Sequence, residues 1–366
     1  MSVRICKENI QAMQMAQVFK DNVRLPDTPP VARRAAHGCD QRITAARAFS
    51  RLTARGRSPS RFFPFSVQED VVNSMDVSRS GEFLVTASDD ETLHVYDWVS
   101  GTHRTVVNSK AYGCGVIKIA PAKGADSVIF ASRTEWDHSV RYLSLHTNSF
   151  LRYFKGHNDV VTSLAVSPKS DMFVSGSRDG SVRVWDLNTN QCQGLIPTGG
   201  SPCVAFDPKG VVVAVGCGAS SIKLFNAAML DAGPFTSWTI DIGANVEIRT
   251  VSFSDDDKLL LVTTNSNVVC IVDAFEGTVV RKWTSRLNSR GATLEACFTP
   301  DSQFVLGGSE DGTVHCWSVE ETEPVHIFTG HAAPVSSVRW NPRLMTFASA
   351  CMNTVLWLPK DVKTIE

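Results

Sequence analysis

Long apolar runs are missing from this sequence. No stretch approaches the roughly 18 apolar residues that a helix needs to cross a bilayer, and the polar start from Met1 to Glu8 lacks the apolar core of a secretory signal. Charged residues make up only 20% of the 366, whereas 43% are hydrophobic. We therefore expect a soluble intracellular protein with one large continuous core rather than two unrelated domains.

Paired cysteines and the common catalytic motifs are absent as well. None of the ten cysteines belongs to a C-x-x-C pair, which favours core packing over disulfides or a metal site. The sequence has no P-loop, no G-x-S-x-G and no H-E-x-x-H motif. Gly216-Cys217-Gly218 begins like a dinucleotide loop, but no helical pattern follows it, so a turn between strands is predicted. We expect no enzyme activity, no cofactor and no metal.

What the sequence has instead is an internal repeat with a period of about 40 to 47 residues. In its clearest copy the alternating segment Thr162–Val166 is followed by Phe173–Gly176, a tight turn at Arg178–Gly180, and Ser181–Trp185. Period-two alternation bounded by Gly, Pro and Asp indicates strands joined by hairpins. One aromatic or apolar residue ends the third strand of each unit: Tyr96, Leu143, Trp185, Phe225, Val272, Trp317 and Trp357.

These seven anchors predict seven units, and the pattern from Gly156-His157 to Trp185-Asp186 resembles the WD repeat. Such units cannot bury both faces alone, but they can when stacked around an axis. The predicted fold is therefore all-β, a seven-bladed WD-repeat β-propeller.

The last unit, Gly330–Pro359, supplies only three strands. We predict that Gln11–Phe19 provides the fourth, so that an N-terminal strand closes the ring and no sheet edge stays open at the seam. A free helical tail over Ile10–Ala16 is the alternative. The expected organisation is a closing strand in residues 10–22, an insert in 23–66, the propeller in 67–359 and a tail in 360–366.

The insert carries most of the charge asymmetry. It holds nine arginines and two aspartates, a net charge of +7, so the remainder of this chain of net charge −1 carries −8. Its prolines favour a solvated top-face loop. Two other interpretations are a basic arm for an acidic, phosphorylated or nucleic-acid partner and a retained intron, and Ser58 is a candidate phosphorylation site. The arginines we would test first are Arg33, Arg34, Arg55, Arg57 and Arg61.

A set of four polar side chains is expected to cross-link the strands within the blades. In the clearest unit, the hydrogen-bonded tetrad typical of WD repeats falls on His157, Asp179, Trp185 and either Ser175 or Ser177. We interpret it as structural rather than as a hydrolase triad, because its hydroxyl is expected to point into packing. The matching turn position is held by aspartate in three other units and by another residue in the rest: Asp90, Asp137 and Asp311, against Ala219, Ser266 and Cys351.

Trp136 stands beside the turn aspartate of the second unit. An exposed tryptophan there would be a candidate partner-binding anchor, and local packing is the alternative.

Several stretches go beyond what a WD repeat requires. Thr293–Phe304, Met345–Cys351, Arg141–His146, Asn190–Leu195 and Ile271–Gly277 closely resemble the WD repeat-containing protein 82 (Swd-two) family, and Ala16–Asn22 is similar to that family's opening strand. The resemblance covers residues 10–22 and about 67–359, in order. The insert departs from the family pattern.

The resemblance implies a nuclear, non-catalytic scaffold. Members of this family are subunits of COMPASS-type histone lysine methyltransferase complexes, and of a protein phosphatase 1 assembly or the cleavage and polyadenylation machinery in transcription termination. They are associated with the phosphorylated tail of RNA polymerase II. The expected partners are therefore protein subunits of a hetero-complex that holds one propeller, with no membrane contact. The alternative is an RNA- or DNA-binding protein that uses the arginine-rich insert.

Overall fold

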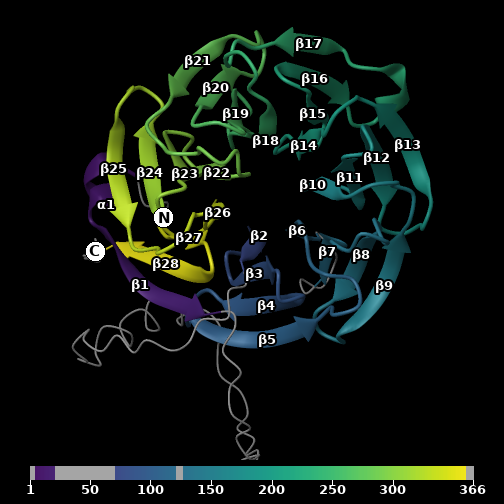
Figure 1. Cartoon of the computed structure of the whole chain (residues 1–366), viewed down its shortest axis with the longest axis horizontal. Helices are drawn as coiled ribbons and strands as arrows, with labels where there is room; N and C mark the ends of the chain where they lie inside the picture. Colours follow the sequence, from purple (N-terminus) through teal and green to yellow (C-terminus); the bar gives the residue numbers. More distant parts are fainter. Residues whose placement is uncertain (1–4, 21–70, 121–126, 360–366) are drawn as a thin grey trace, which may run out of the picture.

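The computed structural model describes residues 5–20, 71–120 and 127–359. These residues form seven four-stranded antiparallel sheets, arranged as blades around a central axis (Figure 1). The predicted seven-bladed all-β propeller is confirmed, and each of the seven anchor residues lies in the third strand of its blade. No helix among the described residues is long and apolar enough to span a bilayer.

The strands of each blade follow one another from the axis to the rim. Blade 1 consists of β2 (Val72–Val77), β3 (Phe83–Ser88), β4 (Thr92–Asp97) and β5 (Thr102–Asn108), and blade 2 of β6 (Ile117–Ile119), β7 (Ser127–Ala131), β8 (Val140–Ser144) and β9 (Ser149–Phe154). Blade 3 consists of β10 (Val161–Val166), β11 (Met172–Ser177), β12 (Ser181–Asp186) and β13 (Cys192–Pro197). Blade 4 consists of β14 (Cys203–Phe206), β15 (Val212–Cys217), β16 (Ser221–Asn226) and β17 (Thr236–Thr239). The 3-10 helix η1 (Leu230–Ala232) lies between β16 and β17.

Blades 5 and 6 repeat this order, and blade 7 does so with a strand from the start of the chain. Blade 5 consists of β18 (Ile248–Phe253), β19 (Leu259–Thr264), β20 (Val269–Asp273) and β21 (Val279–Trp283). Blade 6 consists of β22 (Ala296–Phe298), β23 (Phe304–Gly308), β24 (Thr313–Ser318) and β25 (Pro324–Thr329). Blade 7 consists of β26 (Ser337–Trp340), β27 (Phe347–Ala350), β28 (Asn353–Pro359) and β1 (Met13–Lys20).

The N-terminal strand closes the ring, as the predicted fold class requires. β1 pairs antiparallel with β28, from Met13 opposite Pro359 to Lys20 opposite Asn353. In Figure 1 the purple strand lies along the yellow one at the rim. The alternative of a free helical tail is wrong, because the only helix in this segment, α1 (Lys7–Gln11), ends before β1 begins and is packed.

Helix α1 ties the closing strand to blade 6. Ile10 is fully buried in one cluster with Phe328 of β25 and Trp357 of β28. Gln11 Nε2 donates a hydrogen bond of 3.3 Å to the Val325 carbonyl. The N-terminal segment therefore contacts two blades, and burial of its apolar side chains stabilises the seam.

Apolar clusters join each blade to the next. Val85 and Val95 of blade 1 share a cluster with Val128 and Leu143 of blade 2. At the seam, Met75 of blade 1 packs in one cluster with Leu356 of blade 7 and its neighbours. A β-sheet face needs such a partner surface, so the core lies between the blades.

The cysteines take part in this packing. No disulfide joins those among the described residues, and burial raises the pKa of the Cys203, Cys270 and Cys297 thiols to about 12. This agrees with the predicted core role.

Four predicted segments lie wholly or partly outside the described residues: the end of the closing segment 10–22, the insert 23–66 with Arg33, Arg34, Arg55, Arg57, Arg61 and Ser58, the tail 360–366, and residues 67–70 and 121–126 of the 67–359 propeller range.

Candidate functional site

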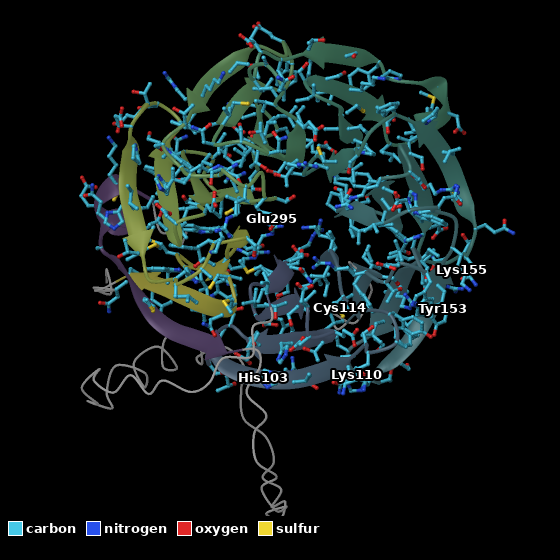
Figure 2. The ribbon with its side chains drawn as sticks, in the orientation of Figure 1. His103, Lys110, Cys114, Tyr153, Lys155 and Glu295 are labelled. Carbon is cyan, nitrogen blue, oxygen red and sulfur yellow. The ribbon has the colours of Figure 1, made fainter. Side chains whose placement is uncertain are left out.

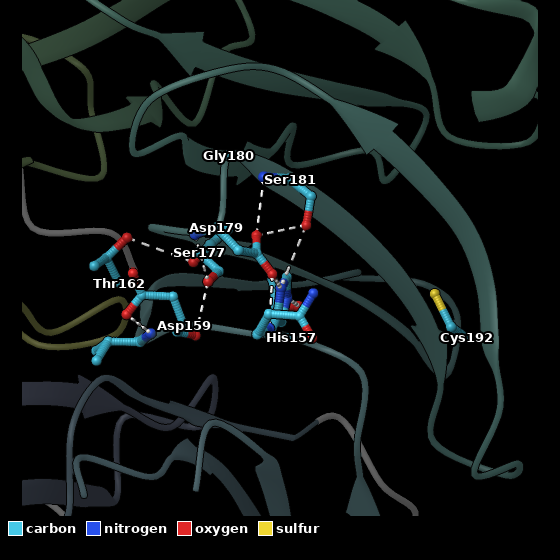
Figure 3. A network of polar contacts seen from close by, with 12 residues as sticks. His157, Asp159, Thr162, Ser177, Asp179, Gly180, Ser181 and Cys192 are labelled. Carbon is cyan, nitrogen blue, oxygen red and sulfur yellow. Dashed lines mark hydrogen bonds and ion pairs between the residues drawn. The ribbon is translucent and has the colours of Figure 1, made fainter. Parts of the chain in front are cut away.

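The polar tetrad of blade 3 is a continuous chain of hydrogen bonds, and Figure 3 shows its part around His157 and Asp179. Trp185 Nε1 donates to Ser175 Oγ at 2.8 Å, and Ser175 Oγ lies 2.7 Å from His157 Nε2. His157 Nδ1 lies 2.9 Å from Asp179 Oδ2. Because the Asp179 carboxylate can only accept, Nδ1–H donates to it, and Nε2 of the neutral imidazole accepts from the Ser175 hydroxyl. Of the two candidate serines, Ser175 therefore occupies the tetrad.

Ser177 has a different role at the same edge of the blade. Its hydroxyl donates to the Asp159 carbonyl at 2.8 Å. Asp179 also accepts from the backbone N–H of Asn158 at 3.0 Å, so the turn after β11 is tied to the connection that enters the blade. We call the face that carries these turns and connections the top face.

The environment of the tetrad keeps its carboxylate ionised and its imidazole neutral. Burial acts to raise the pKa of Asp179, but hydrogen bonds from Ser181, the Asn158 N–H and His157 outweigh it and lower the pKa. For His157, burial lowers the pKa and exceeds the opposing effect of Asp179. His157 and Asp179 are therefore joined by a hydrogen bond between a neutral imidazole and a carboxylate. Both side chains have hydrogen-bond partners, as buried polar groups in proteins generally do.

A hydrolase triad needs an accessible nucleophile, and Ser175 is not one. Its side chain is fully buried, and its oxygen already contacts Trp185 and His157. The arrangement can cross-link strands, but it offers no surface to a substrate.

The other turn aspartates make the same local contacts. Asp90 accepts from the Thr92 N–H at 3.0 Å, Asp137 from the Ser139 N–H at 2.9 Å and Asp311 from the Thr313 N–H at 3.1 Å. Each aspartate thereby caps the turn into the third strand. Burial opposes ionisation of Asp90, but hydrogen bonds from His94, Ser88 and Thr92 lower its pKa to about 2.

Blade 6 uses an arginine where blade 3 has histidine, which the sequence interpretation missed. Arg286 is 1% exposed, and its guanidinium donates to the carbonyls of Leu294 at 3.1 Å, Gly308 at 3.3 Å and Thr264 at 3.4 Å. Burial lowers its pKa to about 10. One signal marks the position: Arg286 follows the buried outer-strand residue Trp283 by three positions.

His157 and His331 follow their own buried outer-strand residues, Phe154 and Phe328, by the same three positions. Repeats aligned on the buried outer-strand residue, rather than on the Gly-His pair, would have identified Arg286 as the counterpart of the histidines.

A charged belt lines the inner strands on both sides of the seam. Arg339 on β26 pairs with Glu295 at 2.9 Å and lies 3.9 Å from Asp76 on β2. Lys118 on β6 lies 3.2 Å from the same Asp76. Glu295 is near the centre of the disc in Figure 2. The belt joins blades 6, 7, 1 and 2 by charge pairs at their inner strands, whereas β1 closes the ring at the rim.

Two hollows in the surface of the described residues lie away from the tetrad. One, of about 240 Å³, lies between Phe83, Arg104, Ile119 and His146. The other, of about 410 Å³, is bordered by the exposed side chains of Val211, Met229 and Phe235. In the described part of the chain no three His, Cys, Asp or Glu side chains are grouped as metal ligands would be.

Trp136, the candidate anchor, projects from the top face of blade 2. It is 69% exposed, and its ring centroid lies 6.1 Å from that of Tyr112. The candidate arginines of the insert lie outside the described residues, so no distance relates them to this side chain.

Comparison with known proteins places the repeats in a described family. The model "WD domain, G-beta repeat" matches residues 60–97, 148–186, 290–318 and 322–358. These matches include the units that hold Trp185 and Trp357, two of the predicted anchors.

Individual relatives match over most of their lengths. WD repeat-containing protein 82 of Drosophila melanogaster is 41% identical over 296 residues, which cover 81% of this chain and 92% of the relative. Protein ANTHESIS POMOTING FACTOR 1 of Arabidopsis thaliana is 37% identical, with 79% and 88% covered. COMPASS component SWD2 of Saccharomyces cerevisiae is 31% identical, with 76% and 88% covered.

Proposed function

Since this chain belongs to the family of WD repeat-containing protein 82, we propose that it is a non-catalytic scaffold subunit of nuclear complexes that act on chromatin and on transcription by RNA polymerase II. The observation that carries this proposal is the 41% identity over 92% of the Drosophila relative and 81% of this chain, an extent far greater than that of a single repeat. A similarity of that extent includes surface positions as well as repeat residues.

The structure supports a scaffold by the way its polar groups are used. The tetrad residues of blade 3 bond to one another, and Arg339 of the charged belt bonds to Glu295. These side chains are thus occupied in holding strands together. A rigid disc then offers a top face, a bottom face and a rim to several partners at once.

The partner class follows from the relatives. The yeast relative bears the name COMPASS component SWD2, and we propose that this chain likewise joins a COMPASS-type histone lysine methyltransferase complex in the nucleus. The family resemblance extends the proposal to a protein phosphatase 1 assembly or the cleavage and polyadenylation machinery, and to the phosphorylated tail of RNA polymerase II.

The test is purification of the tagged full chain from nuclei, followed by mass spectrometry. We expect stoichiometric recovery of a histone methyltransferase scaffold, a phosphatase regulatory scaffold, or both. Recovery of the chain alone, or from cytoplasm only, contradicts the proposal. The matched variant lacks residues 23–66, and we expect it to retain the same partners.

A second candidate function is nucleic-acid binding through the insert, favoured by nine arginines against two aspartates in residues 23–66. A labelled RNA or DNA would then shift in a salt-dependent manner with the full chain and not with the variant lacking 23–66. Equal shifts with both proteins contradict it.

A further inference from the structure

The turn between the second and third strands of blade 2 is longer than its counterpart in blade 3. The last strand pair before the turn is Ala131 with Val140 in blade 2, and Gly176 with Val182 in blade 3. Blade 2 therefore has three additional residues in the turn that carries Trp136. A tryptophan that is 69% exposed contributes little to the core, so its exposure calls for another explanation.

One buried side chain, that of Arg141, holds the base of this turn together. Arg141 is 2% exposed and hydrogen-bonds to both Ser132 and Asp137. Its guanidinium carbon lies 3.4 Å from the ring centroid of Tyr112 and 5.7 Å from that of Tyr153. Cation–π contacts of this kind fix the aromatic rings. A fixed ring loses little entropy when a partner covers it, which is the property of a binding hot spot.

Exposed apolar and basic side chains continue this surface around the rim. On β9, Leu151 is 48% and Tyr153 41% exposed, since alternate residues of the strand face outward. Lys110 and Lys155 are exposed, and neither has an ion-pair partner among the described residues. Figure 2 shows Lys110, Tyr153 and Lys155 along one sector of the disc.

The charged residues of this surface indicate the chemical class of its partner. Two unpaired lysines beside fixed aromatic rings complement a chain with a few carboxylates and an aromatic side chain. A nucleic acid would bring a row of phosphates instead, close to the exposed Glu135 and onto a chain whose charge outside the insert is −8. The observations therefore favour a peptide over a single-stranded nucleic acid.

We propose that this surface, the blade 2 aromatic surface, binds an acidic peptide segment with an aromatic side chain. It consists of exposed or half-buried aromatic, apolar and basic residues: Lys110, Tyr112, Trp136, Leu151, Tyr153 and Lys155. The inference rests on the proposed scaffold role, to which it gives a contact site and a partner chemistry.

The test uses fluorescence anisotropy of the full chain with a fluorescein-labelled peptide of three Asp-Glu-Phe-Gly repeats. We expect saturable binding that Trp136→Ala weakens by about tenfold or more. The double variant Lys110→Glu/Lys155→Glu should weaken it by a similar factor and reduce its dependence on salt. The matched control is Phe275→Ala, which removes another aromatic side chain, 73% exposed in the turn after β20, and should bind as the parent does.

Four results would overturn the inference: no saturable binding by the parent, unchanged binding by Trp136→Ala, an equal loss in Phe275→Ala, or tighter, Trp136-dependent binding of a labelled oligothymidylate. The last result would assign the surface to single-stranded nucleic acid. Thermal melts of all variants check folding.

The nuclear purification is an independent experiment, so a chain that recovers its scaffolds but does not bind the peptide refutes only this inference. A chain that binds the peptide but recovers no scaffold refutes only the proposed function.

Discussion

Nδ1 of His331 lies 3.0 Å from Sγ of Cys351. On its other side, Nε2 of His331 lies 2.6 Å from Ser349 Oγ, which accepts from Trp357 Nε1 at 2.7 Å. Blade 7 thus has the polar chain of blade 3 with a thiol in place of the Asp179 carboxylate. Without a carboxylate to favour the imidazolium, burial lowers the pKa of His331 to about 4.

This environment predicts acid sensitivity of the seam. The pKa of His331 in the folded protein lies below the value of about 6.5 expected in the unfolded chain. Protonation therefore favours the unfolded state, so the contribution to stability is complete above pH 6.5 and is lost as the pH falls toward 4. Urea unfolding should show a loss on the order of 2 kcal/mol between pH 7.5 and 4.5 from this group. An equal slope in His331→Gln would contradict the assignment.

Restoring the carboxylate should reverse the effect. In Cys351→Asp the new side chain stands beside Nδ1, so the pKa of His331 should rise and the acid dependence should flatten. Cys351→Ser is the matched control, because it replaces the thiol with another neutral group. Histidine NMR titrations of the two variants measure the difference, and equal pKa values would rule out the role given to Cys351.

The tetrad of blade 3 should make a measurable contribution to stability. Asp179→Ala leaves His157 Nδ1 and the Asn158 N–H without their acceptor, and we expect the free energy of unfolding to fall by about 2 to 4 kcal/mol. The control is Asp241→Ala, at an exposed position, with an expected change below about 0.5 kcal/mol. A loss below about 0.5 kcal/mol for Asp179→Ala as well would refute the structural role of the tetrad.

The fold was predictable because its determinants are local. Alternating strands, Asp-Gly turns such as Asp179-Gly180 and one anchor residue per unit repeat along the chain, so seven blades and the missing fourth strand could be deduced from spacing alone. The exchanges inside the polar networks were predictable in part. Cys351 was assigned to the turn position of Asp from the repeat spacing. Arg286 was not assigned to the position of His, because the carbonyls that it binds come from different segments and only the folded blade brings them together.

The candidate site was predictable in part. An exposed Trp136 was proposed from its place beside a turn, but its support by Arg141 was not, because the stacking of Arg141 on Tyr112 joins residues of different segments. Tyr153, which lies opposite Arg141 across β8 and β9, gave no sequence signal beyond its strand pattern.

Close packing between blades 4 and 5 gives another prediction. Gly277 has a φ of +73°, and a Cβ atom there would overlap the ring of Trp238 on β17. Gly277→Ala should therefore lower the free energy of unfolding by more than strain at a positive φ alone. Gly233→Ala measures that strain, because Gly233 has a φ of +84° and no atom within 4 Å of the added carbon. We expect the two variants to differ by about 1 to 3 kcal/mol in chemical denaturation. Equal losses would contradict the predicted overlap.

The central claim is that β1 seals the disc and thereby fixes every surface that a partner can reach. Its most direct measurement is urea unfolding of a chain without residues 1–20, against a control without residues 1–4. The longer deletion removes the buried side chains of Ile10 and Met13 and uncovers the edge of β28. The account predicts a loss of about 3 to 6 kcal/mol for it, recovered by adding a peptide of residues 5–20. Unfolding midpoints that coincide for the two deletions would contradict it.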